Sequence, residues 1–228
     1  MRSDGLAGLL AECDAVLFDF DGPICDVFRG LPAPGVAREL ADVLATLAPH
    51  LGEVARATED PMEVHRLAAQ GGEAVLAAVE AALTEAEVRA VKVAGPPVHG
   101  ATEALKAAYV SGHHVAVVSN NSAECVRVYL TKHGLSGAVK QIVGRPTLRP
   151  DLMKPSPYPL LEAASRLGKT PGRMVLIGDS VTDIEAARAA ATRSIGFANK
   201  PAKETSLADA GADEVVLNMM SVTVALEI

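Results

Sequence analysis

Tryptophan is absent from this 228-residue chain, and aromatic residues make up only 3% of it, although hydrophobic residues make up 49%. The interior must therefore be built from the smaller side chains of alanine, valine, leucine and isoleucine. So large a hydrophobic fraction argues against disorder. The length suits one large domain, or a core domain that carries a smaller insertion.

Cysteine is also scarce: the chain has only Cys13, Cys25 and Cys125, without a CxxC pair or a cluster of cysteine and histidine. An odd number of cysteines without such spacing argues against a disulfide framework or a zinc site and favours a reducing compartment. The chain contains no run of about 18 apolar residues, so we expect no membrane span. The first residues make a poor signal peptide. We therefore expect a cytoplasmic protein that has no membrane partner.

Positively charged residues are outnumbered: the chain has 21 Lys and Arg residues but 28 Asp and Glu residues, for a net charge of -7. This net charge argues against a basic surface of the kind that binds nucleic-acid backbones, so we expect no nucleic-acid partner. A small anionic substrate stays possible, because a local positive charge can lie inside an acidic protein.

Short apolar runs recur along the chain and are typical of parallel strands that are buried on both faces. Between the later runs lie amphipathic stretches of helical length, so strand and helix alternate as they do in βαβ units. We therefore expect an α/β fold with a doubly wound, Rossmann-like parallel sheet. The expected strands are residues 15–18, 115–118, 141–143, 174–177, 194–197 and 214–217, and the expected helices are 100–111, 123–133, 158–167 and 182–191.

Residues 26–94 lack a convincing strand and are rich in alanine, leucine, glutamate and arginine. They predict an α-helical cap domain inserted into a core domain of residues 1–25 and 95–228. The expected cap helices cover residues 35–48, 62–82 and 85–91. The last would begin at Thr84, because acidic residues follow it in the first turn.

Polar side chains follow three of the expected strands at the points where the strands end. Because ligand sites of open parallel sheets lie at the carboxyl ends of the strands, we expect these residues to meet in one site. They are Asp19 and Asp21 after the first strand, Ser119 and Asn120 after the second, and Asp179, Ser180 and Asp183 after the fourth, with Lys154 preceding a later helix.

These residue types suit phosphoryl transfer. A carboxylate can attack phosphorus and form an aspartyl-phosphate, and Mg²⁺ can cancel the repulsion between two approaching anions. A lysine adds a point charge, while hydroxyl and backbone N–H groups hold the phosphoryl oxygens. A second carboxylate can protonate the leaving group and later deprotonate water.

Four motifs occur in order: DxDG at residues 19–22, Ser119 after the second strand, Lys154 followed by Pro155, and GDSxxD at residues 178–183. Together they resemble the haloacid dehalogenase-like hydrolase superfamily, and in particular its branch with a helical cap, which includes phosphoglycolate phosphatases. The chain departs from this family at Pro23, where threonine or valine is common. Proline has no N–H to offer, and we expect it to stiffen the link into the cap.

The resemblance implies that Asp19 is the nucleophile and a ligand of Mg²⁺. It implies that Asp21 is the general acid and base, with its backbone carbonyl on the metal, and that Asp179 is a further metal ligand. The expected enzyme is a Mg²⁺-dependent phosphatase of a small phosphorylated metabolite, acting as a monomer or a homodimer.

The resemblance also implies that Ser119, Lys154 and the backbone amide of Asn120 bind the phosphoryl group, and that Lys154 assists catalysis. Asp183 would be an alternate ligand, or would orient Lys154 or a metal-bound water, with Ser180 beside it. From the residues alone, Ser180 and Asp183 could instead serve only as caps of the following helix.

Other activities within this superfamily stay open to different degrees. Asp21 favours phosphate over dehalogenase chemistry, which does not need an acid at that position. The phosphonate-cleaving relatives use a cap lysine, and no lysine occurs between Cys25 and Val91. Sugar-phosphate mutases often carry a histidine where this chain has Leu31, so a phosphomutase is the alternative enzyme. A weakly catalytic binding or regulatory module is the other alternative.

The cap residues do not identify a substrate. Arg29, Arg56, His65 and Arg66 could face it, but we interpret each as a charged or polar side chain on a solvated helix face. We interpret Cys25 as a small buried residue. Phosphoglycolate, sugar phosphates and nucleotides therefore all remain candidate substrates.

Overall fold

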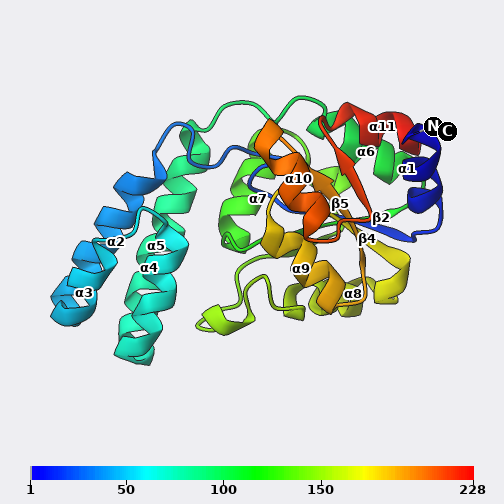
Figure 1. Ribbon diagram of the computed structural model, residues 1–228. Helices are drawn as coiled ribbons and strands as arrows, with labels where there is room; N and C mark the ends of the chain where they lie inside the picture. Colours follow the sequence, from blue (N-terminus) through cyan, green and yellow to red (C-terminus); the bar gives the residue numbers. More distant parts are fainter. Residues whose placement is uncertain (1) are drawn as a thin grey trace.

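The computed structural model describes residues 2–228 and contains one six-stranded sheet in the order β3-β2-β1-β4-β5-β6, in which each neighbouring pair is parallel (Figure 1). The strand order reverses between β1 and β4, and such a reversal leaves a crevice at the carboxyl ends of the strands. The predicted doubly wound sheet is therefore confirmed. The strands are β1 (Ala15–Phe18), β2 (His114–Val118), β3 (Gln141–Val143), β4 (Met174–Gly178), β5 (Arg193–Phe197) and β6 (Glu214–Val216).

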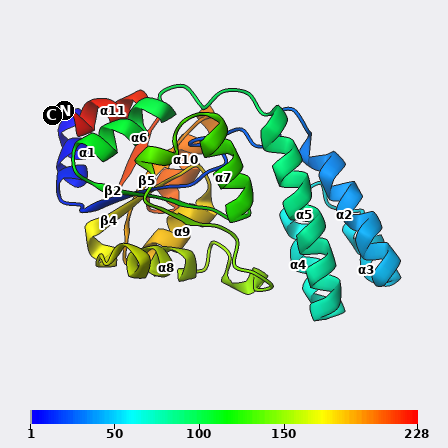
Figure 2. The same cartoon turned by 180° about the vertical axis from the view of Figure 1, so that it is seen from behind.

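Helices cover both faces of the sheet, as Figures 1 and 2 show from opposite sides. Side chains of β1 alternate between the two resulting cores: Val16 and Phe18 join one, and Ala15 and Leu17 join the other. Burial on both faces explains why β1 reads as an unbroken apolar run. The first core is lined by α1 (Arg2–Ala11), α6 (Ala101–Val110), α7 (Ala123–Lys132) and α11 (Met220–Leu226), and the second by α8 (Tyr158–Leu167) and α9 (Val181–Ala189), while α10 (Pro201–Asp209) packs beside β5 and β6.

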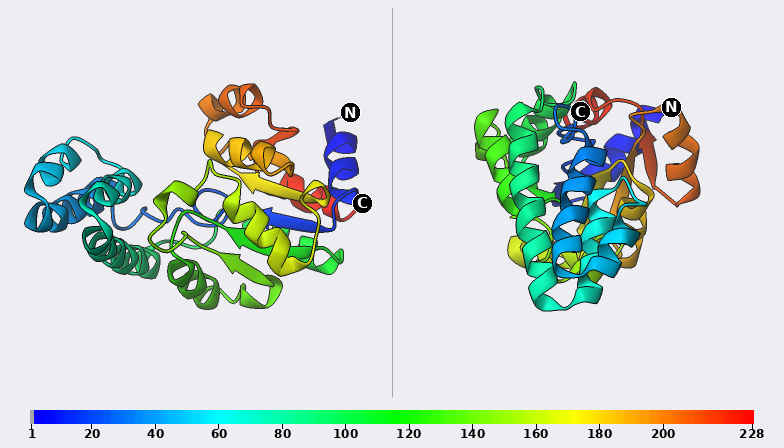
Figure 3. Two further views of the ribbon diagram at one scale, coloured as in Figure 1. Left: turned by 90° about the horizontal axis from the view of Figure 1, so that it is seen from below. Right: turned by 90° about the vertical axis from the view of Figure 1, so that its left-hand side faces the viewer.

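Four helices between β1 and β2 form a separate packed unit beside the sheet (Figure 3). They bury a core of their own that includes Leu40, Leu44, Val64 and Leu83. The helices are α2 (Ala33–Leu47), α3 (Pro49–Ala55), α4 (Pro61–Ala68) and α5 (Glu73–Val93).

The predicted helix boundaries in this unit were partly wrong. The chain breaks between α4 and α5 at a short 3-10 turn, Ala69–Gly71, and at Gly72, whose φ of 89° suits glycine. A single helix over 62–82 therefore does not form. Helix α5 then continues through Thr84 to Val93, so no helix begins at Thr84. Helix α3 was not predicted.

No helix in the described part of the chain combines the length and the apolar character that a membrane span requires.

Candidate active site

All predicted site residues line one cavity of about 670 Å³ at the carboxyl edge of the sheet. The strands β1, β2 and β4 lie side by side there, because the register pairs Phe18 with both Val117 and Ile177. The side chains that follow these strands are thereby brought together, although they come from distant parts of the sequence. They are Asp19, Asp21, Ser119, Asn120, Lys154, Asp179, Ser180 and Asp183.

Lys154 is the central cation of this cavity, and only 2% of its side chain is exposed. Its Nζ donates to Oδ1 of Asp19 at 2.8 Å, to Oδ1 of Asp183 at 2.5 Å and to the carbonyl oxygen of Val118 at 3.1 Å. Although desolvation opposes it, contact with Asp183 and Asp19 holds the pKa of Lys154 above its ordinary value. The lysine therefore stays charged and fixes the orientation of both carboxylates.

Asp183 has two tasks, because its two oxygens make different contacts. Oδ1 accepts from Lys154, while Oδ2 accepts from the hydroxyl of Ser180 at 2.6 Å and from its backbone N–H at 3.1 Å. Ser180 and Asp183 together form a capping box at the start of α9. Capping is thus present, but it is not the sole contact of Asp183.

The loop after β2 presents Ser119 and Asn120 to the cavity. The side chain of Asn120 is engaged by the backbone of Lys154, since its Oδ1 accepts from the Lys154 N–H at 2.9 Å and its Nδ2 donates to the Lys154 carbonyl at 3.2 Å. This pair of bonds ties the second motif to the third. The Ser119 hydroxyl contacts Asn121.

Burial perturbs two of the acidic groups in the cavity, Asp19 and Asp21. Burial raises the pKa of Asp19, and nearby Asp183 and Asp179 add to the effect, while the Lys154 ammonium opposes it. Burial also raises the pKa of Asp21 to about 6, opposed by the backbone N–H of Val27. Both shifts have the sign expected of carboxyl groups removed from water, and the neighbouring carboxylates add to the effect.

Three of the carboxylates, those of Asp19, Asp179 and Asp183, offer oxygens that lie within 4.8 Å of one another. Lys154 engages only Oδ1 of Asp19, and Lys203 and Asn199 engage only Oδ2 of Asp179. One oxygen of each of these two carboxylates can therefore face a cation. An all-oxygen donor set of this charge fits Mg²⁺.

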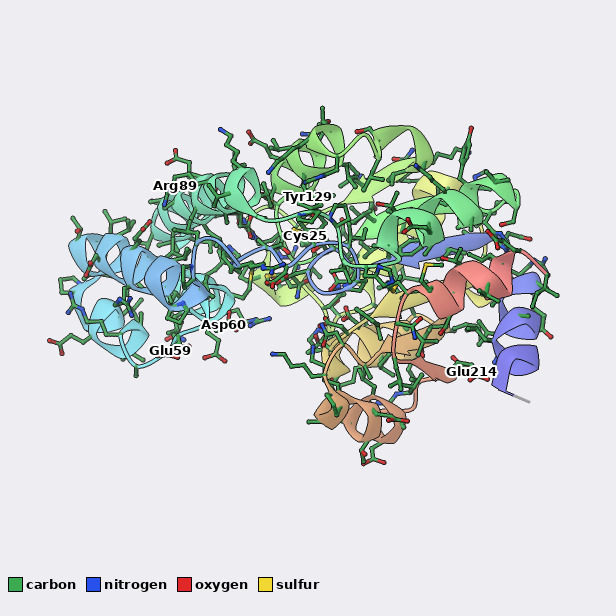
Figure 4. All side chains as sticks on the ribbon, turned by 90° about the horizontal axis from the view of Figure 1, so that it is seen from above. Cys25, Glu59, Asp60, Arg89, Tyr129 and Glu214 are labelled. Carbon is green, nitrogen blue, oxygen red and sulfur yellow. The ribbon has the colours of Figure 1, made fainter. Side chains whose placement is uncertain are left out.

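The other side of the cavity is lined by Phe28, Ala33 and the segment of residues 58–63, which belong to the helical unit and to the chain that leads into it. Glu59 and Asp60 lie on the side of this unit that faces the core (Figure 4). Arg29, Arg56, His65 and Arg66, which the sequence analysis interpreted as side chains on solvated helix faces, are absent from the cavity lining.

Two of these residues have other partners. Arg56 pairs with exposed Asp42. His65 is fully buried against Glu80, and its pKa is lowered by burial, so its predicted place on a solvated face was wrong. Cys25 is buried as predicted, and burial raises the pKa of its thiol to about 12.

Sequence reasoning missed Lys203, which contacts Asp179, and the buried pair of Glu87 and Arg145, which contacts the loop after β2. Arg145 stands just beyond the carboxyl end of β3, so the strand-end rule that identified the other residues also applied to it. Glu87 was interpreted as part of a helix start, and its buried position in α5 offers no comparable signal.

Residues 13–191 match a family model described as haloacid dehalogenase-like hydrolase. The chain is similar to a phosphoglycolate phosphatase of Xylella fastidiosa, with 30% identity over 79% of this chain and 78% of that protein. It is also similar to a phosphoglycolate phosphatase of Nitrosococcus oceani, with 38% identity over 40% of each protein. For several such relatives the matched segment spans 37% to 40% of their length.

Solved structures share the fold. A hydrolase of this family from Deinococcus radiodurans, with bound phosphate and sodium, is 27% identical and superposes with a TM-score of 0.62, covering 95% of this chain and 96% of that one. A β-phosphoglucomutase from Clostridium difficile is 18% identical with a TM-score of 0.68, covering 94% and 97%. The resemblance predicted from the four motifs is confirmed by the family match.

Proposed function

Because this chain belongs to the haloacid dehalogenase-like hydrolase family, we propose that it is a Mg²⁺-dependent phosphatase that acts on a small phosphorylated metabolite. The observation that carries the proposal is the contact of one buried lysine, Lys154, with Asp19 and Asp183 in a cavity that Ser119 also lines. A cation, a candidate nucleophile and a hydroxyl group thus surround one cavity, as the binding of a phosphoryl group requires.

Asp19 is the proposed nucleophile. One of its oxygens attacks phosphorus while the bond from phosphorus to the substrate oxygen breaks, and Asp21 gives that oxygen its proton. Water then attacks the aspartyl-phosphate, Asp21 takes a proton from the water, and phosphate leaves with Asp19 restored. A pKa of about 6 for Asp21 suits both proton transfers near neutral pH.

The phosphoryl oxygens are held by Lys154, by the Ser119 hydroxyl and by the backbone N–H of Asn120. The two hydrogen bonds between the Asn120 side chain and the Lys154 backbone support this role, because they hold this loop beside the lysine at the cavity. Donors that are fixed before the reaction stabilise developing charge at little reorganisation cost.

Mg²⁺ would be held by Asp19, Asp179 and the backbone carbonyl of Asp21, and it would neutralise the charge between the phosphoryl group and the carboxylates. Asp183 orients Lys154 and is itself held by Ser180. The contacts of both Asp183 oxygens support a positioning role over a ligand role.

Residues 26–94 are proposed to act as a cap domain on a core of residues 1–25 and 95–228. The contribution of residues 58–63 to the cavity supports this, since a cap that covers the site excludes water from it. The core would then bind the phosphate, and the cap would bind the leaving group.

The cap wall bears on the substrate class. Its charged side chains at the cavity are Glu59, Asp60 and Glu63, and Lys154 is the cation in the lining. A leaving group with its own carboxylate would meet like charge there. We therefore propose a neutral or cationic leaving group, in contrast to the phosphoglycolate named for the relatives.

A phosphomutase is the second candidate, and the fold shared with a β-phosphoglucomutase is the observation that keeps it. A mutase retains the phosphoryl group, whereas a phosphatase releases it to water. A weakly catalytic binding module is disfavoured by the presence of Asp19, Asp21 and Lys154 together. A cytoplasmic location and a monomeric or homodimeric state stay predictions.

The test is hydrolysis of a generic aryl phosphate, in the presence of Mg²⁺ and in the presence of EDTA. The rate is measured as the release of inorganic phosphate. We expect metal-dependent turnover that Asp19→Asn reduces by at least about a thousandfold, because the nucleophile is lost. Glu53→Asn, which changes an exposed carboxylate of α3, is the matched control and should retain activity. Metal-independent turnover, or full activity of Asp19→Asn, would refute the proposal.

A further inference from the structure

One face of α5 carries three polar side chains that contact the loop after β3. Glu80, Thr84 and Glu87 follow the spacing i, i+4, i+7, which places them along one side of the helix. Glu80 accepts from the backbone N–H of Leu148 at 2.9 Å. Thr84 and Glu87 both accept from Arg145, at 3.0 Å and 2.7 Å. The helix is thereby joined to the core along two turns.

Glu87 is the buried centre of this contact. The exposed fraction of its side chain is 0%, and that of Arg145 is 1%. The two guanidinium nitrogens Nη1 and Nη2 face the two carboxylate oxygens, at 2.7 Å and 3.3 Å. Such a paired arrangement is the stronger form of charge-assisted hydrogen bond, and burial excludes the water that would weaken it.

Glu87 also binds the loop that follows β2. Its Oε1 accepts from Nδ2 of Asn121 at 3.2 Å, and its Oε2 accepts from the backbone N–H of Ser122 at 2.9 Å. Both oxygens of Glu87 are therefore shared between Arg145 and this loop. Arg145 adds bonds of its own, to the carbonyl oxygens of Asn120 and Asn121.

Asn121 carries the contact onward to Ser119. Because Nδ2 of Asn121 donates to Glu87, its Oδ1 points the other way and accepts from the Ser119 hydroxyl at 3.2 Å. The backbone N–H of Asn121 donates to the same hydroxyl oxygen at 3.1 Å. Glu87 thus fixes the orientation of the Asn121 amide, and this amide and the Asn121 N–H together hold the Ser119 hydroxyl in place.

We infer that Glu87 is a positioning residue for phosphate binding: through Asn121 it sets the Ser119 hydroxyl, so that helix α5 of the cap controls the phosphoryl-binding loop of the core. The inference rests on the proposed function, because it assigns phosphate binding to Ser119. By this inference the cap influences binding of the phosphoryl group as well as contacting the leaving group.

Glutamine cannot replace Glu87 without loss, although it has the same shape. The site holds four donors, namely two from Arg145, one from Asn121 and one from Ser122. A glutamine amide offers one acceptor oxygen and places N–H groups against the remaining donors. The Asn121 amide then loses the partner that fixes its orientation.

The experiment measures binding of inorganic phosphate by calorimetry in the presence of Mg²⁺, together with kcat and KM for an aryl phosphate. We expect Glu87→Gln to weaken phosphate binding and to raise KM by about tenfold each, as the loss of one or two well-placed hydrogen bonds implies. Arg89→Gln is the control, because Arg89 lies two residues away on α5 and pairs with exposed Glu39. It should bind phosphate as the wild type does.

A double-mutant cycle separates positioning from a merely structural role. Asn121→Ala should also weaken phosphate binding, and the double variant should be no weaker than the weaker single variant, because both changes interrupt one path. The inference is overturned if the affinity loss of the double variant equals the product of the two single losses. It is also overturned if Glu87→Gln lowers Tm but leaves phosphate binding unchanged.

Two further outcomes are informative. If Glu87→Gln does not fold, Glu87→Asp takes its place in the cycle, since it keeps the charge opposite Arg145 but is one methylene shorter. If the wild type binds phosphate but turns over no phosphate ester, the proposed function fails, while the phosphate-binding cycle still decides the role of Glu87.

Discussion

The backbone of Gly22 lies directly against the carboxylate of Asp179. A Cβ built on Gly22 would lie 2.6 Å from Oδ1 of Asp179 and closer still to its Cγ, and Gly22 has a φ of 106°. The glycine of the first motif is therefore required by the aspartate of the fourth, which comes from another strand of the sheet.

We predict that Gly22→Ala abolishes detectable turnover, because the added methyl group displaces Asp179 from the proposed metal site. Gly112→Ala is the matched control: Gly112 has a φ of 89°, and a Cβ added there would meet nothing within 4 Å. The control should lower Tm by only a few degrees, from a backbone cost of about 1–2 kcal/mol. Equal loss of activity in both variants would contradict the steric explanation.

Removal of the central cation should destabilise the metal-free protein. Lys154→Met leaves Asp19 and Asp183 buried without their shared partner, which we expect to cost about 3–5 kcal/mol at neutral pH. Urea unfolding in EDTA measures this. Exposed Lys106 on α6 provides the control, Lys106→Met, which should change stability by less than about 0.5 kcal/mol. If Lys154→Met leaves the free energy of unfolding unchanged, the contacts of Lys154 with Asp19 and Asp183 do not form in solution.

Asp21 makes the stability of the metal-free protein depend on pH. Its pKa is raised from 3.8 to about 6 by burial, so the folded state favours the protonated form. The folded state then binds more protons than the unfolded state between these values, and the free energy of unfolding falls as pH rises through this window. The contribution is present below about pH 4 and is lost above about pH 6.

Asp21→Asn should therefore be more stable than the wild type at pH 7.5, by roughly 3 kcal/mol, and should lose most of this advantage at pH 4. The measurement is urea unfolding in EDTA at both pH values. Other carboxyls titrate in both proteins, so the difference isolates Asp21. Asp26→Asn, at an exposed position of the same segment, is the control. An advantage that does not depend on pH would exclude this explanation.

Reversal of one charge on the cap wall should change substrate preference. Glu59 is exposed and lines the cavity. We expect Glu59→Lys to raise kcat/KM for phosphoglycolate relative to glycerol phosphate by about tenfold, because the carboxylate of the former then meets a cation. Glu53→Lys makes the same exchange outside the cavity lining and should leave the ratio unchanged. A wild type that already prefers phosphoglycolate would contradict the proposed substrate class.

Local patterns predicted the parts of the fold that depend on neighbouring residues. The apolar run before Asp19 predicted β1 because a strand buried on both faces has few polar positions. The polar residues after β1, β2 and β4 predicted one shared cavity, since parallel strands direct their carboxyl ends to one edge of the sheet. Within α4 and α5 the same reasoning failed, because the alanine-rich sequence on either side is strongly helical and outweighed the Gly71-Gly72 pair, which is the local sign of a break.

The sequence alone determined the family, the parallel sheet and the residues that surround Asp19, because each depends on spacing along one short segment or on the order of motifs. Only the tertiary structure decided that Glu87 meets Arg145, 58 residues away, and that Asn121 links this pair to Ser119. A glutamate on an amphipathic helix has the same local sequence signal whether it faces water or a buried guanidinium. Its partner is set by how α5 lies against the loop after β3, and that packing arises from contacts spread over the whole chain.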